Sequence, residues 1–137
     1  MSTEANKALR SRVLREIEVA GNPASIDELL TPDVTVYGFG QPVQGREAQK
    51  GFTAMMHAAI PDIEGTIEDM IAEGDLVVSR WTFHGTHRGD LMGIPPTGKR
   101  ITMSGMDLTR IVNGQIAEMR VMMDQLGMFR QLGVIPE

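Results

Sequence analysis

The sequence predicts an α+β fold: a curved, mostly antiparallel sheet wraps as a cone around three N-terminal helices, and a short C-terminal helix follows. The prediction rests on a change in the spacing of apolar residues along the chain. Apolar residues recur at helical spacing as far as Pro61, and from Ile63 onward apolar and polar residues alternate. No repeat or linker interrupts the chain, so we expect one domain over residues 1–137. Such a sheet leaves a cavity between its inner face and the helices.

The helical half is delimited by capping and breaking residues. The first helix is expected to begin at residues 2–3, to carry an apolar stripe at four-residue spacing, and to stop at residues 21–22. A short helix is predicted over residues 26–30 and a longer one over about 46–60. Between them, residues 34–37 are β-branched and aromatic, which favours a strand.

The second half is predicted to be a meander. Strands are expected over residues 63–72 and 76–87. Residues 88–99 are too rich in Gly and Pro for regular structure, and a loop of this length in a small domain is usually functional or a lid. A hairpin over residues 100–124 follows, and a last helix is expected over 125–132.

The hairpin contains the main catalytic candidates. Asn113-Gly114 between two β-rich runs is a strong hairpin signal, since both residues tolerate the positive φ of a type I′ turn. A two-residue turn places Asp107 opposite Arg120 on one face of the sheet. We therefore expect Asp107 as a catalytic acid/base with Arg120 as its charged partner; a purely structural ion pair is the alternative.

Composition excludes several classes of function. The chain has 18 acidic and 13 basic residues, and the basic ones are scattered, so neither nucleic acid nor an anionic membrane is expected as a partner. There is no cysteine, no apolar run long enough to cross a bilayer and no signal peptide, which favours a cytoplasmic protein. His84 and His87 form an H-x-x-H pair, but residues three apart on a strand face opposite sides, so no metal site is expected.

Eleven methionines are an unusual number for 137 residues. Met fills irregular gaps, so the methionines either complete the core or form an adaptable wall for a large, flat, apolar ligand. Trp81 and Tyr37 are the only residues of their kinds. Trp81 either packs in the core or stacks on a ligand, and Tyr37 either donates a hydrogen bond to a ligand carbonyl or packs at the rim. His87 is expected to order the following loop or to touch a ligand.

Three segments resemble the SnoaL-like polyketide cyclases: HRGDLMGIPPTG at residues 87–98, RIVNGQI at 110–116 and QLGV at 131–134. The resemblance covers nearly the whole chain. It implies the α+β cone fold that these cyclases share with ketosteroid isomerase, scytalone dehydratase and limonene epoxide hydrolase. Fold transfers across this superfamily more readily than function.

The well-known family members look like cofactor-free aldol cyclases that close the last ring of an anthracycline precursor, using an aspartate as acid/base with a glutamine and a histidine that orient the substrate. Matched position by position, these residues fall on Val121, Gly105 and Asp107. Valine cannot exchange a proton, so the family's base is missing at that position. The family pocket includes both positions 107 and 121, which the simple hairpin register puts on opposite faces; a β-bulge between Glu118 and Val121 would reconcile them.

Three functions follow from these observations. The first is cofactor-free ring cyclisation or isomerisation of a polycyclic polyketide, with Asp107 as acid/base and Arg120 and His87 polarising a carbonyl. The second is cofactor-independent hydroxylation of a quinone or dihydroquinone, as the divergent members that lack the aspartate imply. The third is a non-catalytic ligand-binding dimer. A homodimer through the outer sheet face, a small hydrophobic substrate, and no cofactor or metal are expected. The expected substrate-binding residues are Tyr37, Phe52, Met56, Trp81, His87, Met103, Met119, Val121 and Met123.

Overall fold

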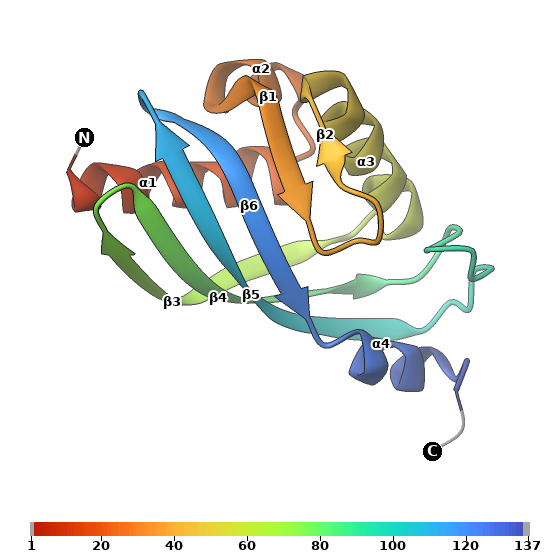
Figure 1. Ribbon diagram of the computed structural model, residues 1–137. Coiled ribbons are helices and arrows are strands. Elements are labelled where there is room, and N and C mark those ends of the chain that lie inside the picture. Colours follow the sequence, from red (N-terminus) through yellow and green to blue (C-terminus); the bar gives the residue numbers. More distant parts are fainter. Residues whose placement is uncertain (1, 136–137) are drawn as a thin grey trace.

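Six strands form one open, curved sheet in the computed structural model, which describes residues 2–135 (Figure 1). The strand order is β2-β1-β6-β5-β4-β3, and every neighbouring pair is antiparallel except β1 and β6, which run parallel. The predicted α+β class and mostly antiparallel sheet are confirmed. The strands are β1 (Leu30–Tyr37), β2 (Val43–Gln44), β3 (Glu64–Glu73), β4 (Leu76–Thr86), β5 (Arg100–Val112) and β6 (Gln115–Met123).

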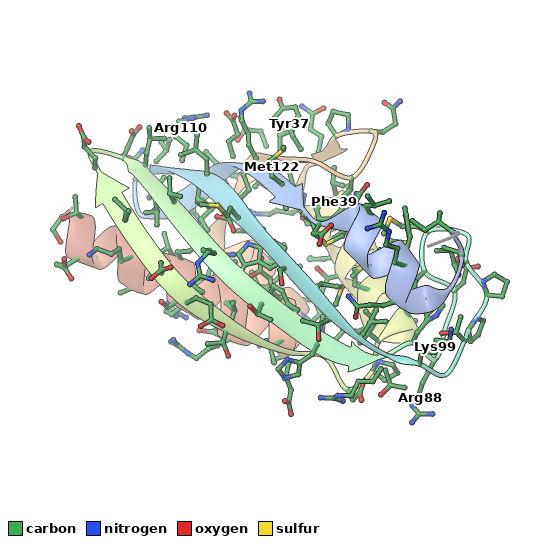
Figure 2. All side chains as sticks on the ribbon, turned by 90° about the horizontal axis from the view of Figure 1, so that it is seen from below. Tyr37, Phe39, Arg88, Lys99, Arg110 and Met122 are labelled. Atoms are coloured by element: carbon green, nitrogen blue, oxygen red, sulfur yellow. The ribbon has the colours of Figure 1, made fainter. Side chains whose placement is uncertain are left out.

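The helices pack on the concave side of this sheet, except α4, which extends from the end of β6 (Figures 1 and 2). The first helix begins as predicted, because the Ser2 side chain accepts a hydrogen bond from the Ala5 amide at 3.0 Å. It packs against β3 and β4, while α2 and α3 pack against β1. The helical segments are α1 (Thr3–Val13), η1 (Leu14–Val19), α2 (Pro23–Leu29), α3 (Arg46–Ala59) and α4 (Gln125–Leu132).

The segment η1 continues α1 as a wider π-helical turn, in which the Ala20 amide donates to the carbonyl of Arg15, five residues earlier. The sequence pattern predicted a regular helix here. A π turn takes up one extra residue, so it changes which side chains face the sheet beyond it, and such turns are frequent at functional sites.

The β5–β6 hairpin turns at Asn113-Gly114 as predicted, with Val112 paired to Gln115. The pairing then shifts, because Arg110 lies opposite Glu118 and leaves Ala117 as an extra residue on β6. The bulge therefore falls directly before the predicted stretch 118–121. It changes the face of every later residue on β6.

As a result, Asp107 is paired with Val121, and the predicted pairing of Asp107 with Arg120 is wrong. Arg120 lies opposite Leu108. Positions 107 and 121 are both buried on the inner face of the sheet, as the bulged register requires.

Among residues 2–135, no helix combines the length and the apolar character needed to span a membrane. The cytoplasmic location expected from the sequence stays a prediction.

Candidate active site

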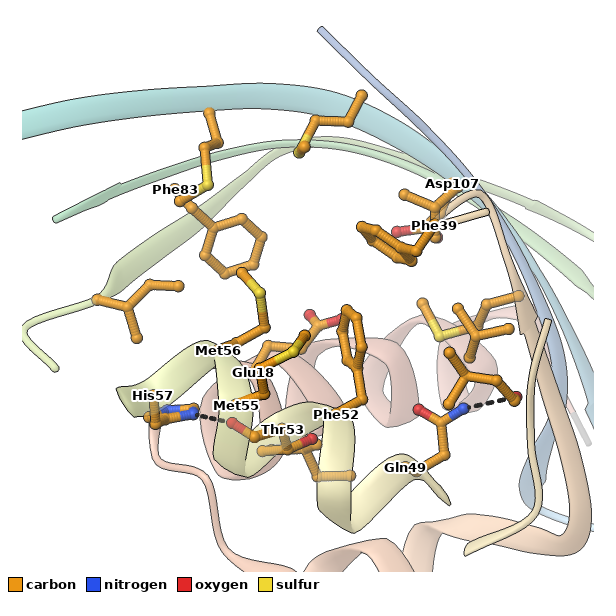
Figure 3. Close-up of a pocket in the computed structure, with 18 of the residues that line it drawn as sticks. Glu18, Phe39, Gln49, Phe52, Thr53, Met55, Met56, His57, Phe83 and Asp107 are labelled. Carbon is orange, nitrogen blue, oxygen red and sulfur yellow. Dashed lines mark hydrogen bonds between the residues drawn. The ribbon is translucent and has the colours of Figure 1, made fainter. Parts of the chain in front are cut away.

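A cavity of about 250 Å³ lies between the inner face of the sheet and the helices η1 and α3 (Figure 3). Its wall is almost entirely apolar. Leu91 and Met92 of the loop after β4 border it, so the loop predicted to be functional does contact the cavity. The methionines on the wall are Met55, Met56, Met92, Met103, Met119, Met123 and Met128, and the polar residues are Glu18, Gln49, Thr53, His57 and Asp107.

Most of the predicted site residues meet at this cavity, although they come from α3, β4, β5 and β6. Tyr37, His87 and Arg120 are the predicted residues that do not line it. The predicted residues that do are Phe52, Met56, Trp81, Met103, Asp107, Met119, Val121 and Met123.

Asp107 lies on the inner face of β5 and is only 3% exposed. Its carboxylate accepts hydrogen bonds from Arg10 Nη2 at 2.8 Å and Arg10 Nε at 3.4 Å. It also accepts one from Trp81 Nε1 at 2.9 Å and one from Thr109 Oγ1 at 2.9 Å. The partner of Asp107 is therefore a guanidinium from the first helix rather than one from the neighbouring strand.

The expected ion pair between Asp107 and Arg120 does not form. The Arg120 side chain is 57% exposed and its Nε lies 2.7 Å from a carboxylate oxygen of Glu118. Its guanidinium stacks on the Tyr37 ring, 4.4 Å from the ring centre. The bulge at Ala117 is the physical reason, because it turns Arg120 toward the outer face of the sheet.

Arg10 is fully buried and links Asp107 to a second carboxylate, that of Glu18. Its Nη1 lies 2.9 Å from Glu18 Oε1, eight residues further along the chain. In a regular α-helix the residue seven positions on returns to the same face. The extra residue of the π turn moves that position to Glu18 and so brings both side chains together.

The group Asp107, Arg10 and Glu18, here called the carboxylate–guanidinium cluster, carries two acidic groups and one basic group. Burial raises the pKa of Glu18, the negative charge of Asp107 raises it further, and Arg10 opposes both. Burial by itself lowers the pKa of Arg10, but the two carboxylates outweigh it and raise that pKa well above the ordinary arginine value. Arg10 therefore stays charged, and Glu18 holds a proton more readily than an ordinary glutamate.

Gly105 makes the space in which Trp81 reaches Asp107. A Cβ at position 105 would lie 2.6 Å from Trp81 Cη2 and 2.6 Å from the Met122 carbonyl oxygen, which is closer than real contacts allow. The absence of a side chain at 105, where the family resemblance places a glutamine, thus goes together with the indole N–H that donates to Asp107.

His87 is buried away from the cavity and contacts the loop after β4. Its Nδ1 accepts from the Thr97 backbone amide at 3.2 Å and contacts Thr97 Oγ1 at 2.9 Å. An amide N–H can only donate, so the ring proton is on Nε2. The His84 ring contacts Glu64 at 3.2 Å at an exposed position, away from His87.

The sequence interpretation missed Arg10 and four polar residues of the cavity wall, which are Glu18, Gln49, Thr53 and His57. The apolar stripe assigned Leu9 and Ile17 to the buried face, and it carries no signal for the π turn that brings Arg10 and Glu18 together. His57 lines the cavity, and its ring nitrogens contact the carbonyl oxygens of Thr53 at 2.9 Å and Val19 at 2.8 Å.

Comparison with known sequences gives one family. The sequence model of the SnoaL-like polyketide cyclase family matches residues 8–132. The chain is 42% identical over 60 residues to the aklanonic acid methyl ester cyclase DnrD of Streptomyces peucetius, over 44% of this chain and 41% of that protein. It is 38% identical over 72 residues to the nogalonic acid methyl ester cyclase of Streptomyces nogalater, over 51% of this chain and 54% of that protein. The matches thus span about half the length of these relatives.

Solved structures share the fold over nearly the full length. A candidate SnoaL-like polyketide cyclase of Jannaschia sp. CCS1 superposes with a TM-score of 0.89 at 26% identity, covering 98% of this chain and 95% of that one. AclR of Streptomyces galilaeus, a candidate hydroxylase, superposes with a TM-score of 0.85 at 25% identity, covering 99% of this chain and 85% of that one.

Proposed function

The chain belongs to the SnoaL-like polyketide cyclase family, and from this premise we propose that it is an enzyme that closes or isomerises a ring of a polycyclic polyketide by cofactor-free acid/base chemistry. The observation that carries the proposal is the carboxylate–guanidinium cluster on the wall of an otherwise apolar cavity. Ionisable groups in a cleft of this kind, with at least one shifted pKa, are typical of proton-transfer sites.

The cavity wall supports the substrate class. Phe52 and Phe39 pack with their ring centres 4.8 Å apart, and Trp81 and Phe83 with theirs 5.0 Å apart, so flat apolar surfaces face the same space as the methionines. A fused-ring substrate buries its faces against such rings, and flexible Met side chains adapt to its outline. Its carbonyl oxygens then have the few polar side chains of the wall as partners.

Ring closure or isomerisation requires a group that removes a proton from a carbon next to a carbonyl and returns a proton later. Val121 cannot do this, so the cluster of Asp107, Arg10 and Glu18 takes that role in the proposal. Arg10 keeps a positive charge behind the Glu18 and Asp107 carboxylates of the wall, which favours the negative charge that develops on an enolate. Arg120 and His87, which lie away from the cavity, have no part in the proposed step.

The test is conversion of two named probes, aklanonic acid methyl ester and nogalonic acid methyl ester, followed by absorbance and mass spectrometry. An aldol ring closure gives a product of unchanged mass with a changed spectrum. Emission of Trp81, the only tryptophan, reports binding separately. Binding without any change of mass or absorbance favours the non-catalytic module. The absence of both binding and conversion overturns the proposal.

A matched pair of variants locates the reaction. Met56→Trp fills the cavity from α3, whereas Ala54→Trp adds the same side chain at an exposed position of the same helix. We expect Met56→Trp to lose conversion and Ala54→Trp to keep it. Equal activity of the two variants would place the chemistry elsewhere.

Hydroxylation is the second candidate, favoured by the similarity to AclR and by valine at position 121. In that reaction the protein binds and deprotonates a dihydroquinone that itself reacts with oxygen. One atom of O₂ is then added to the ring and the other leaves as water, because the dihydroquinone supplies the electrons and is itself oxidised to the hydroxyquinone. Equal rates in air and under nitrogen would exclude it.

We also propose that the chain forms a homodimer through the outer face of the sheet. Met106, Leu108 and Met122 are exposed there, and Met122 is 79% exposed on the side away from the helices (Figure 2). An apolar patch on a sheet face is a common site of self-association.

A further inference from the structure

We propose that Glu18, rather than Asp107, is the side chain that exchanges the proton with the substrate. The inference rests on the proposed acid/base function and names its catalytic group. It moves the proton acceptor from the sheet, where the family resemblance places it at position 121, to the π turn at the end of the first helix.

The hydrogen bonds of Asp107 argue against a direct role. Four donor atoms from Arg10, Trp81 and Thr109 surround its two oxygens, at 2.8 to 3.4 Å. Its side chain is only 1% exposed. A carboxylate with its lone pairs occupied in this way offers no free oxygen to a substrate C–H.

Glu18 differs on each of these counts. Among residues 2–135, Arg10 is the only hydrogen-bond partner recorded for its carboxylate, with contacts of 2.9 and 3.4 Å. Its side chain is 26% exposed and lines the cavity. In Figure 3 the Glu18 carboxylate points into the space beside Phe52.

The charges of the cluster lead to the same assignment. One guanidinium serves two carboxylates, so the fully ionised cluster carries one excess negative charge beside apolar walls. A proton on Glu18 removes that excess and leaves the buried Arg10–Asp107 pair intact. The raised pKa of Glu18 agrees with this. His57 of α3 is the other titratable side chain on the wall, and its ring is bound to backbone carbonyls.

The proton transfers balance without a co-reactant. The Glu18 carboxylate takes the proton from a carbon next to a carbonyl, and the C–H electron pair becomes an enolate. The enolate carbon bonds to a ketone carbon, whose oxygen receives the carbonyl electron pair. That oxygen takes the proton back from Glu18, so substrate and product are isomers and the carboxylate is regenerated.

The deciding variant is Glu18→Gln, which keeps the shape and the contact with Arg10 but cannot accept the proton. Glu16→Gln is the control, because Glu16 lies on the same π turn but binds Arg12 and Ser25. With the two methyl ester probes in D₂O, NMR follows loss of the acidic C–H and absorbance follows ring closure. We expect Glu18→Gln to slow both at least about 100-fold while Trp81 emission reports unchanged binding, and Glu16→Gln to behave as wild type.

Asp107→Asn separates the two carboxylates. We expect it to slow C–H exchange much less than Glu18→Gln does, with the acid limb of its pH profile moved to lower pH, because loss of the neighbouring negative charge lowers the pKa of Glu18. Full exchange in Glu18→Gln overturns the inference while leaving the proposed function standing, and the result does not depend on whether Asp107→Asn folds. If the wild type neither exchanges nor converts a probe, the proposed function itself fails.

Discussion

Arg10 is the residue on which the site depends, because it is the one cation between a carboxylate from the helix layer and a carboxylate from the sheet. Removing water from charged groups is unfavourable, and a buried cluster is tolerated only while its charges and hydrogen bonds are matched. With Arg10 absent, Glu18 and Asp107 would face each other with no counter-charge. The cluster therefore joins the two layers as well as forming the proposed site.

We expect Arg10→Met to lower the free energy of unfolding at pH 7 by about 3–5 kcal/mol. Without the guanidinium the Glu18 carboxyl group loses the charge that opposes its raised pKa, so the variant is closest to wild type below the ordinary carboxyl pKa, and its deficit grows as the pH rises through the raised value. Urea unfolding of both proteins at pH 4.5 and pH 7 measures this. A deficit that is the same at both pH values would contradict the electrostatic explanation.

We expect Gly105→Ala to displace the Trp81 ring, because the new methyl group would occupy its place. The loss of stability should be about 1–3 kcal/mol, typical of overpacking, and Trp81 emission should shift to the red as the indole leaves its buried position. Gly51→Ala is the matched control, since Gly51 lies in α3 with open space around it, and there alanine should stabilise by roughly 0.5–1 kcal/mol. An unchanged emission spectrum in Gly105→Ala would show that the strands move instead of the ring.

At the scale of the elements, helix ends and turns were predicted correctly from the sequence wherever a local signal fixes the backbone. The helix start at Ser2 and the turn at Asn113-Gly114 depend on short-range hydrogen bonds or φ angles, and both were predicted. The π turn and the bulge at Ala117 have no such local signal, because each is set by packing against distant strands and helices. The two missed partners, Arg10 and Glu18, are consequences of the first irregularity, and the misassigned Arg120 is a consequence of the second.

We expect deletion of Ala117 to unfold the protein or to force the turn to move. Without the extra residue the hairpin would take the simple register, and the buried side chains of Met119 and Val121 would turn to the outer face. Each apolar side chain that turns to solvent in this way lowers the free energy of unfolding by about 1.5–3 kcal/mol. Circular dichroism and thermal unfolding of the deletion, beside Ala117→Ser as the control, measure the effect; a deletion as stable as the control would mean that the bulge is dispensable.

At the scale of the whole molecule, the period change at residue 61 and three short segments were enough for the fold and the family, both of which are confirmed. A cavity was also expected from the fold class, and of the two interpretations of the methionines the structure supports a wall that contains them. The carboxylate–guanidinium cluster could not be predicted from the sequence, because Arg10 and Asp107 are 97 residues apart in the sequence and meet only when the helix lies across the sheet.

We expect the proposed homodimer to weaken when a charge is placed on the outer sheet face. Met122→Lys puts an ammonium group at a 79% exposed apolar position, and Leu126→Lys does the same at a 53% exposed position on α4. Sedimentation velocity should show Met122→Lys shifted toward monomer at concentrations where the wild type and Leu126→Lys are dimers. A monomeric wild type would refute the dimer.

When Glu18 is ionised, the surplus negative charge of the cluster also opposes the entry of anionic guests. A guest that carries its own ionised acid group would meet Glu18 and Asp107 in a largely apolar space, where like charges repel strongly. A guest whose acid is masked as an ester meets no such barrier. We therefore expect the protein to bind an ester more tightly than the corresponding free acid, as Trp81 emission would measure.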